Sequence, residues 1–465
     1  MKRQLVATLL LLIALPAFAA SVGAAGIVAL LTHADAGRGL KRPELVRRMA
    51  HRTRARRRLL SSSSSSSHAK ESDRPVRAGL GAGGGGSIVT NEYLVHLSVG
   101  TPPRPVALTL DTGSDLVWTQ CAPCLNCFDQ GVALLDPAGS STYAAVPCDA
   151  PLCRALPFTS CGGGGGTSWG ERRCVYVYHY GDKSLTVGQL ATDRFTFEPS
   201  SDGGNADGQS ERRLTFGCGH FNKGIFQANE TGIAGFGRGR WSLPSQLGVT
   251  SFSYCFTSMF ESKSSLVTLG APAELQRHAH IGSVQSTPLL KDPSQPSLYF
   301  LGLKGISVGR TRLPVPERRL RSTIIDSGAS ITTMPEDVYE AVKAEFVAQV
   351  GLPVIGAEAG SALDLCFALP EPASPFWRRR RRRLPAVRVP SLTLHLEGAD
   401  WELPRGNYVF EDHGARVMCL VLDAAPGDQT VIGNYQQQNT HVVYDLDNDL
   451  LSFAPAQCDK LAASL

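Results

Sequence analysis

The chain has 465 residues, of which 43% are hydrophobic, 47 are glycine and 29 are proline. Its formal net charge of +5 comes from residues 1–80, which hold 15 Lys+Arg and 4 Asp+Glu; the remainder holds 31 Lys+Arg and 37 Asp+Glu, a net charge of −6. No run of about 18 apolar residues follows the N-terminal region, so we expect no membrane span. The many glycines and prolines, with short alternating apolar runs, favour a mostly β protein.

Residues 1–20 are predicted to form a secretory signal peptide. A basic head with Lys2 and Arg3 precedes an apolar run from Leu5 to Ala20, and Ala17-Phe18-Ala19 has the Ala-x-Ala form of a cleavage site. The compact leucine-rich core argues against an organellar transit peptide. The chain is therefore expected to enter the secretory pathway as a soluble protein.

Residues 21–86 are interpreted as a removable pro-segment with a low-complexity linker. The stretch from Leu40 to Leu60 is strongly basic with helical character, and it leads into a serine tract (Ser61 to Ser67) and a glycine-rich tract (Gly81 to Gly86). A basic segment over an acidic cleft would be held at neutral pH and released as carboxylates become protonated, which predicts acid-triggered maturation. The alternative is a solvated, disordered linker, because polar low-complexity tracts bury too little apolar surface to become ordered.

The remaining residues are expected to form two lobes, 87–250 and 251–465, because this part is long enough for two separate cores. In the first lobe, apolar residues at every second position of 93–99 predict a half-buried strand. In the second lobe, residues 333–337 predict a helix start with acids in its first turn. The apolar stripe of that helix is expected to face the core and consists of Val338, Val342, Phe346 and Val350.

One pattern occurs twice, as Leu110-Asp111-Thr112-Gly113-Ser114 and as Ile325-Asp326-Ser327-Gly328-Ala329, with the two aspartates 215 residues apart. Each copy follows an apolar run of strand character. Each is matched downstream by an apolar element with glycine, Gly232-Ile233-Ala234-Gly235 and Val431-Ile432-Gly433-Asn434. Two half-chains that each carry one aspartate at a strand end predict a duplicated fold with one shared site. The alternative is two unrelated turns, since aspartate next to glycine is ordinary in loops.

Two facing carboxyl groups, here Asp111 and Asp326, provide acid–base chemistry. Like charges a few ångströms apart disfavour the second ionisation, so the pair shares one proton. The ionised partner can accept a proton from a water molecule while the protonated partner polarises a peptide carbonyl. The pattern therefore predicts two catalytic aspartates that act together.

The residues next to the aspartates suit this role. Gly113 and Gly328 allow a tight turn close to a bound peptide, and the hydroxyls of Thr112 and Ser327 are small enough to cross-link the two loops through backbone amides.

The residue three positions after each aspartate differs between the copies. Ser114 can donate to the outer oxygen of Asp111, whereas Ala329 cannot donate to Asp326. Because a donor stabilises the charged form, the missing hydroxyl is expected to raise the pKa of Asp326.

At these residues the sequence resembles the pepsin-like aspartic proteases, and within them the plant nepenthesin-like branch, over residues 88–459. In that family the paired aspartates share one proton, the arrangement on which the interpretation above is based. The resemblance implies an all-β, bilobed double β-barrel with minor helices and a central substrate cleft. It also implies an aspartic endopeptidase that acts at acidic pH on polypeptides, as a monomer, without metal or organic cofactor. Such a protein would reside in the apoplast or the vacuole.

The segment from Val175 to Tyr180 alternates aromatic and β-branched residues and leads into the hairpin tip Tyr180-Gly181-Asp182-Lys183-Ser184. The resemblance implies that this tip is the flap that closes over substrate, with Tyr180 as its tyrosine in contact with Trp118. The family favours glycine where Lys183 stands, so a positive φ there would strain the lysine. An ordinary hairpin with an exposed lysine is the alternative.

Seven of the 12 cysteines lie between residues 121 and 174. The Cys-x-x-Cys-x-x-Cys spacing at 121–127 hints at zinc, but a secreted chain favours disulfides, and spacing alone does not give the pairing. We therefore predict no metal site. The pairing that the resemblance implies is Cys121–Cys124, Cys127–Cys218, Cys148–Cys174, Cys153–Cys161, Cys255–Cys458 and Cys366–Cys419.

Two further motifs concern the surface. Asn229-Glu230-Thr231 is a sequon and predicts a glycosylation site at Asn229. The run Arg378 to Arg383 is interpreted as a disordered loop, with binding of a polyanion or a membrane surface as the alternative. No recognition helix or zinc module accompanies the arginines, so no nucleic-acid partner is expected.

A rival interpretation from another functional class is a non-catalytic binding protein of the same fold, similar to the cereal xylanase inhibitors. Both aspartates and both following glycines are present, which favours the enzyme. A second rival is a polyanion-binding protein whose function depends on the arginine run.

Overall fold

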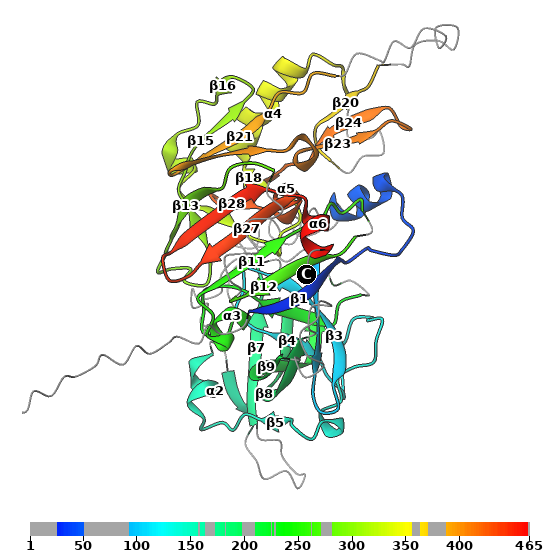
Figure 1. Ribbon diagram of the computed structural model, residues 1–465, viewed down its shortest axis with the longest axis vertical. Coiled ribbons are helices and arrows are strands. Elements are labelled where there is room, and N and C mark those ends of the chain that lie inside the picture. The colour runs from blue at the N-terminus through cyan, green and yellow to red at the C-terminus, as the bar shows by residue number, and fades with distance from the viewer. Residues whose placement is uncertain are drawn as a thin grey trace, which may run out of the picture.

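The computed structural model describes residues 26–50 and 93–463, except for 157–158, 163–172, 182, 198–209, 225, 227–228, 262, 271–280, 356–362 and 371–386. Strands dominate this part of the chain and the helices are few, which confirms the predicted all-β fold with minor helices. Two lobes lie one above the other in Figure 1, with strands of a shared sheet between them. The predicted signal peptide, the serine and glycine tracts and the arginine run lie outside the described residues.

The N-terminal half contains ten strands among its described residues. They are β1 (Ile27–His33), β2 (Tyr93–Val99), β3 (Arg104–Asp111), β4 (Trp118–Gln120), β5 (Ala144–Ala145), β6 (Thr159–Gly162), β7 (Arg173–His179), β8 (Leu185–Phe197), β9 (Ser210–Lys223) and β10 (Gly232–Gly235). The short helices α2 (Pro151–Ala155) and α3 (Leu243–Leu247) accompany them. The predicted strand at 93–99 is β2, and it buries Tyr93, Val95, Leu97 and Val99 as expected.

The C-terminal half begins with β11 (Ser251–Cys255), β12 (Ser265–Leu269), β13 (Gln285–Leu290), β14 (Phe300–Leu301), β15 (Leu303–Val308), β16 (Thr311–Arg312), β17 (Thr323–Ile325) and β18 (Thr333–Pro335). It continues with β19 (Val354–Ile355), β20 (Cys366–Ala368), β21 (Leu392–Leu396), β22 (Ala399–Leu403), β23 (Val409–Asp412), β24 (Val417–Leu420), β25 (Asp423–Ala425), β26 (Thr430–Ile432), β27 (Thr440–Asp445) and β28 (Leu450–Pro455). Its helices are α4 (Glu336–Val350), α5 (Asn434–Gln437) and α6 (Cys458–Ala463).

The strands of the described residues form one 20-stranded sheet and two four-stranded sheets, with the orders β16-β15-β21-β22 and β19-β20-β24-β23. Both four-stranded sheets belong to the C-terminal half, where they pack near α4 at the top of Figure 1. The predicted helix is α4, which starts at Glu336 because Thr333–Pro335 pair as β18 with β25. Its residues Val338, Val342 and Phe346 are buried, as the apolar stripe predicted, while Val350 is half-buried.

The duplication predicted from the two aspartate motifs is visible in the strand pairing. In the first half β10 runs parallel to β3, with Gly235 opposite Asp111. In the second half β26 runs parallel to β17, with Ile432 opposite Ile325. The two downstream apolar elements therefore lie beside the strands that carry the aspartates, and each half presents its aspartate at the same point of an equivalent motif.

Part of the predicted pro-segment is built into the fold. Strand β1 pairs antiparallel with β12 on one side and with β2 on the other, and it lies between the lobes in Figure 1. Residues 42–50 are helical, and Leu45, Val46 and Met49 pack in a cluster with Phe410 and Tyr435. For residues 26–50 the alternative of a solvated linker is therefore wrong, because alternate side chains of β1 are buried in a shared sheet.

Six disulfides form, and four of the predicted pairs are wrong. In place of Cys121–Cys124 and Cys127–Cys218, the structure has Cys121–Cys218 and Cys124–Cys127. In place of Cys148–Cys174 and Cys153–Cys161, it has Cys148–Cys161 and Cys153–Cys174. The predicted pairs Cys255–Cys458 and Cys366–Cys419 are present.

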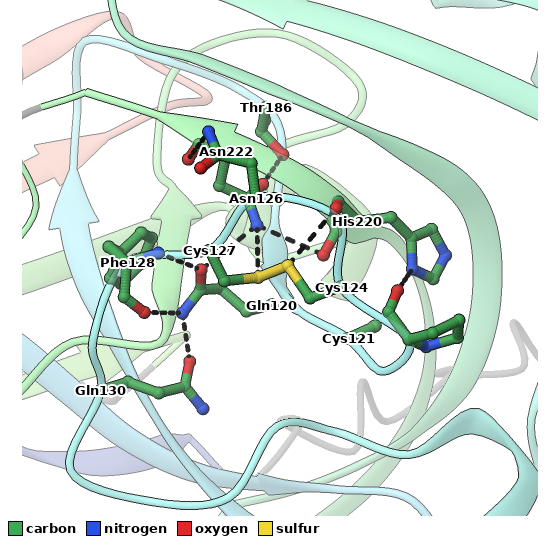
Figure 2. The surroundings of a disulfide bond; sticks show 12 residues. Gln120, Cys121, Cys124, Asn126, Cys127, Phe128, Gln130, Thr186, His220 and Asn222 are labelled. Atoms are coloured by element: carbon green, nitrogen blue, oxygen red, sulfur yellow. Dashed lines mark hydrogen bonds between the residues drawn. A yellow bond between two sulfur atoms is a disulfide. The ribbon is translucent and has the colours of Figure 1, made fainter.

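Strand register explains the first of these corrections. Strands β4 and β9 run parallel with Thr119 opposite Cys218, so Cys121 is brought to within 5.3 Å of Cys218 between Cα atoms. Cys124 and Cys127 then remain together in the loop that follows β4 (Figure 2).

Burial explains the second correction. Helix α2 buries Cys153 in the same apolar cluster as Cys174, and these two cysteines pair. Cys148 and Cys161 stay nearer to solvent and pair with each other.

Candidate active site

The two aspartate loops meet inside the protein and are cross-linked to each other. Asp111 ends β3, Asp326 follows β17, and both side chains have an exposed fraction of 0%. The amide N–H of Thr112 donates to Oγ of Ser327 at 3.0 Å, and the amide N–H of Ser327 donates to Oγ1 of Thr112 at 2.9 Å. The sequence predicted this reciprocal link, and it holds together two strand ends from opposite halves of the chain.

The glycines set the approach of the two carboxyl groups. The N–H of Gly113 donates to Oδ1 of Asp111 at 2.9 Å, and the N–H of Gly328 donates to Oδ1 of Asp326 at 2.8 Å. A methyl group added at Gly328 would lie 2.3 Å from Oδ1 of Asp111 and 3.2 Å from Oδ1 of Asp326. Both inner oxygens therefore border the same small space, and only glycine leaves it open.

The hydroxyl that follows the first aspartate is in place and its counterpart is absent. Ser114 Oγ donates to Oδ2 of Asp111 through a short hydrogen bond. The matching residue of the second loop is Ala329, which is buried and has no polar side chain. The backbone of that loop is instead tied to α5, where Asn434 donates through Nδ2 to the carbonyl of Ser327 at 3.0 Å.

The hairpin of β7 and β8 carries the predicted flap residues. Nε1 of Trp118 donates to Oη of Tyr180 at 2.7 Å, the contact that the sequence predicted, and Tyr180 is buried. Burial raises the pKa of Tyr180 well above its ordinary value, and the nearby Tyr178 and Asp111 raise it further. The phenol therefore stays neutral and lies near the first aspartate.

The tip of this hairpin is strained as predicted. Lys183 has φ of 65° and is exposed, and its N–H donates to the carbonyl of Tyr180 at 3.0 Å. Gly181 lies between them and is half-buried, whereas residue 182 is outside the described residues. An L-residue rarely adopts this backbone conformation, so glycine would suit position 183 better.

An aromatic wall beside the flap escaped the sequence analysis. Phe128 stacks on Phe226 with ring centroids 4.3 Å apart, and Phe226 meets Trp118 edge to face at 5.6 Å. Figure 2 shows how Phe128 is held: Gln120 accepts from its N–H at 3.1 Å and donates through Nε2 to its carbonyl at 3.0 Å. The loop that contains Cys124–Cys127 thus brings an aromatic ring to Trp118 of β4, which contacts Tyr180, and no local sequence signal marks this contact.

Two other residues near the dyad were also not selected from the sequence. Tyr178 lies two residues before Tyr180 on β7, and its hydroxyl accepts from the N–H of Asp115 at 3.2 Å. Asp115 itself lies one residue beyond the repeated motif. The period of two along β7 could have pointed to Tyr178, because residues i and i+2 share one face of a strand.

Within the ranges that the structure describes, no group of three or more His, Cys, Asp or Glu side chains is placed to hold a metal ion. No helix in those ranges is long and apolar enough to cross a membrane.

Comparison with known proteins matches both halves of the chain. Family profiles described as "Xylanase inhibitor N-terminal" and "Xylanase inhibitor C-terminal" match residues 93–271 and 298–455. The chain is 36% identical to aspartic proteinase nepenthesin-1 of Nepenthes gracilis over 441 residues, which cover 93% of this chain and 90% of that protein. The chain belongs to the pepsin-like plant aspartic protease family. Another member, aspartyl protease family protein 2 of Arabidopsis thaliana, is 37% identical over 82% of this chain and 73% of its own length.

Solved structures support the pepsin-like plant fold. Basic 7S globulin from soybean has a TM-score of 0.62 at 16% identity, with 94% of this chain and 99% of that chain covered. Conglutin gamma from lupine seeds has a TM-score of 0.63 at 17% identity, with coverages of 94% and 98%. At these sequence identities the similarity to the two solved structures shows the fold alone.

Proposed function

We propose that the protein is an aspartic endopeptidase that hydrolyses peptide bonds in polypeptides at acidic pH, with Asp111 and Asp326 as its catalytic pair. The observation that carries this proposal is the reciprocal link of the two loops, 3.0 Å from Thr112 to Ser327 and 2.9 Å in return, which brings two buried carboxyl groups from opposite halves to one space. The relatives named as aspartic proteinases support the same class of reaction.

The chemistry follows from one shared proton. The ionised carboxyl group accepts a proton from a water molecule as the water oxygen attacks the peptide carbonyl carbon, and the protonated carboxyl group donates its proton to the carbonyl oxygen. In the tetrahedral intermediate a proton is returned to the amide nitrogen, the C–N bond breaks, and a carboxylic acid and an amine leave. These proton transfers and bond changes require neither an external oxidant nor a metal ion.

The flap supplies the enclosed environment. Tyr180 begins the hairpin tip and accepts a hydrogen bond from Trp118, and the hairpin can cover a peptide and exclude bulk water. We assign substrate contact to Tyr180 and Gly181, and dyad support to Thr112, Ser114 and Ser327.

A second candidate function is a binding protein without proteolysis, since both matching profiles bear the description of a xylanase inhibitor. The complete dyad favours the enzyme, because a binder has no use for two buried carboxyl groups at such close range.

Several expectations extend the proposal. We propose that the chain is secreted to the apoplast or delivered to the vacuole, and that the enzyme acts as a monomer after the pro-segment is removed.

Asn229 is proposed as the glycosylation site. Its side chain is exposed, and its Nδ2 donates to the carbonyl of Ala34 in the pro-segment at 2.8 Å. A glycan on Asn229 would therefore lie at the edge of the docked pro-segment.

The test is proteolysis of a denatured globular protein by acid-treated protein, with and without pepstatin. The proposal predicts degradation that pepstatin blocks and that Asp111→Ala and Asp326→Ala each reduce by about a thousand-fold or more. Binding of a xylanase with no pepstatin-sensitive degradation by a correctly folded, pro-segment-free protein would favour the inhibitor instead. Unchanged activity after deletion of residues 378–383 would separate the arginine run from catalysis.

A further inference from the structure

The three residues 236–238 directly follow β10 and bind the first aspartate loop through their backbone. The N–H of Phe236 donates to the carbonyl of Asp111 at 2.7 Å, and the N–H of Gly237 donates to the carbonyl of Ser114 at 2.8 Å. Two successive N–H groups therefore hold this segment against both ends of the Asp111 motif.

The same segment is bound to the C-terminal half of the chain. The N–H of Arg238 donates to the carbonyl of Ser297 at 3.0 Å, and the phenol of Tyr299 donates to the carbonyl of Phe236 at 2.9 Å. A methyl group added at Gly237 would lie 2.8 Å from the carbonyl oxygen of Ser297, so the two chain segments are in close contact. The hydroxyl of Tyr299 is thus the side-chain donor that reaches from the second half to the segment behind the first aspartate.

Tyr299 also binds the strand that leads to the second aspartate. Its carbonyl accepts from the N–H of Ile325 at 3.1 Å, and Ile325 directly precedes Asp326. A chain of three hydrogen bonds therefore runs from the carbonyl of Asp111 through Phe236 and Tyr299 to Ile325. This connection is separate from the reciprocal link of the two loops, which is made by the residues that follow the aspartates.

The ring of Tyr299 is held on several sides. Its exposed fraction is 0%, the ring of Tyr444 meets it at 4.7 Å and that of Phe252 at 6.2 Å between centroids, and the guanidinium of Arg238 lies 5.4 Å from its centroid. Burial raises the pKa of Tyr299 well above its ordinary value, Tyr444 and Asp115 raise it further, and Arg238 lowers it. The phenol therefore keeps its proton and stays a hydrogen-bond donor at the pH values where an acid protease works.

We propose that Tyr299 is a positioning residue, whose hydroxyl fixes the separation of the Asp111 and Asp326 loops by joining the backbones that support them. This inference rests on the proposed endopeptidase function. Two carboxyl groups share a proton only at close range, and a small change in the position of reacting groups has a large effect on the rate. Tyr299 is buried and acts through the two aspartates, so its loss should change turnover rather than substrate binding.

The test variant is Tyr299→Phe, which removes the hydroxyl and keeps the ring, so the packing and the backbone hydrogen bond from Ile325 remain while the connection to Phe236 is lost. We expect kcat for a short peptide to fall about ten-fold and KM to change by less than about two-fold. A less constrained pair of carboxyl groups is coupled more weakly, so the acid and neutral limbs of the kcat/KM pH profile should move towards each other.

The matched control is Tyr408→Phe. Tyr408 is also buried, with an exposed fraction of 3%, and its hydroxyl also donates to a backbone carbonyl at 2.9 Å, that of Pro390. This hydrogen bond lies outside both aspartate loops. Its loss should lower the melting temperature about as much as Tyr299→Phe does, with kcat and both limbs of the pH profile like those of wild type.

The readouts are pepstatin-sensitive peptide hydrolysis across pH and thermal unfolding, both on the pro-segment-free protein. A lower kcat with shifted limbs in Tyr299→Phe alone supports the inference. Wild-type kcat and limbs in Tyr299→Phe overturn it, and so does an equal loss of kcat in Tyr408→Phe, because the effect would then be one of general stability. A folded wild-type protein without pepstatin-sensitive hydrolysis refutes the proposed function instead. In that case crystal structures decide the inference: a larger separation of the two carboxyl groups in Tyr299→Phe supports it, and an unchanged separation overturns it.

Discussion

In the first aspartate loop the hydroxyl of Ser114 donates to the outer oxygen of Asp111, and Asp115 then ties the loop to Gly239 and Ser297. In the second loop Ala329 offers no donor, and the support comes from α5 through Asn434. The strand pairing and the glycine hydrogen bonds of the two loops are nevertheless the same. The duplicated backbone therefore fixes where the carboxyl groups lie, and the unequal side chains give the two loops different hydrogen-bond donors.

The largest effect should come from filling the space that both carboxyl groups border. In Gly328→Ala the new methyl group would lie 2.3 Å from Oδ1 of Asp111, so the dyad must separate, and we expect a loss of kcat of about a hundred-fold or more. Gly406→Ala is the matched control, since no heavy atom lies within 4 Å of the position of its methyl group. Wild-type kcat in Gly328→Ala would show that the two loops do not share one site.

The next effect concerns the reciprocal link that makes the loops one unit. Thr112→Val and Ser327→Ala each leave a buried N–H without its hydroxyl acceptor, and each should lower the free energy of unfolding by about 1–3 kcal/mol in denaturant titration. Because the two side chains act across the same junction, the double variant should lose less than the sum of the single losses. Full additivity would mean that the two hydrogen bonds are independent.

The side-chain difference between the two loops can be tested by adding the hydroxyl to one loop and removing it from the other. Ala329→Thr adds a donor beside Asp326, which favours its charged form, so the acid limb of the pH profile should move to lower pH. Ser114→Ala removes the corresponding donor from Asp111 and should move the acid limb to higher pH. The pH dependence of kcat/KM for a short peptide measures both, and equal acid limbs in all three proteins would contradict this explanation.

The smallest effect is expected at the flap tip. Lys183→Gly relieves a side chain from φ of 65° and should raise the stability of the folded protein by about 1 kcal/mol. Because Lys183 is exposed, kcat should change little, and any change should appear in KM through the mobility of the hairpin. A lower melting temperature in Lys183→Gly would show that the lysine side chain supports the tip.

The sequence was sufficient to predict the repeated elements. It was not sufficient to predict the cysteine pairing, which depends on strand register. Asp111, Asp326 and their apolar–glycine partners are recognisable because the same local pattern occurs twice, and the structure pairs those elements as predicted. The pairing of Cys121 with Cys218 depends on how β4 lies against β9, which residue spacing does not contain.

Two other features were not predicted, because they depend on contacts between residues that lie far apart in the chain. The strand β1 gains its partners β2 and β12 only in the folded chain, so the sequence did not predict a strand at residues 27–33 within the pro-segment. Asp115 likewise accepts a hydrogen bond from Ser297, which lies 182 residues further along the chain, so the sequence alone did not mark it.

The central claim is that two acids from opposite halves of the chain act as one catalytic pair. The most direct measurement is kcat/KM of Asp111→Asn, Asp326→Asn and the double variant, on a peptide at acidic pH and with pepstatin as the blank. A shared pair predicts that each single variant is as inactive as the double variant, because neither carboxyl group can hold or pass the proton alone. Substantial pepstatin-sensitive activity in either single variant would contradict the account.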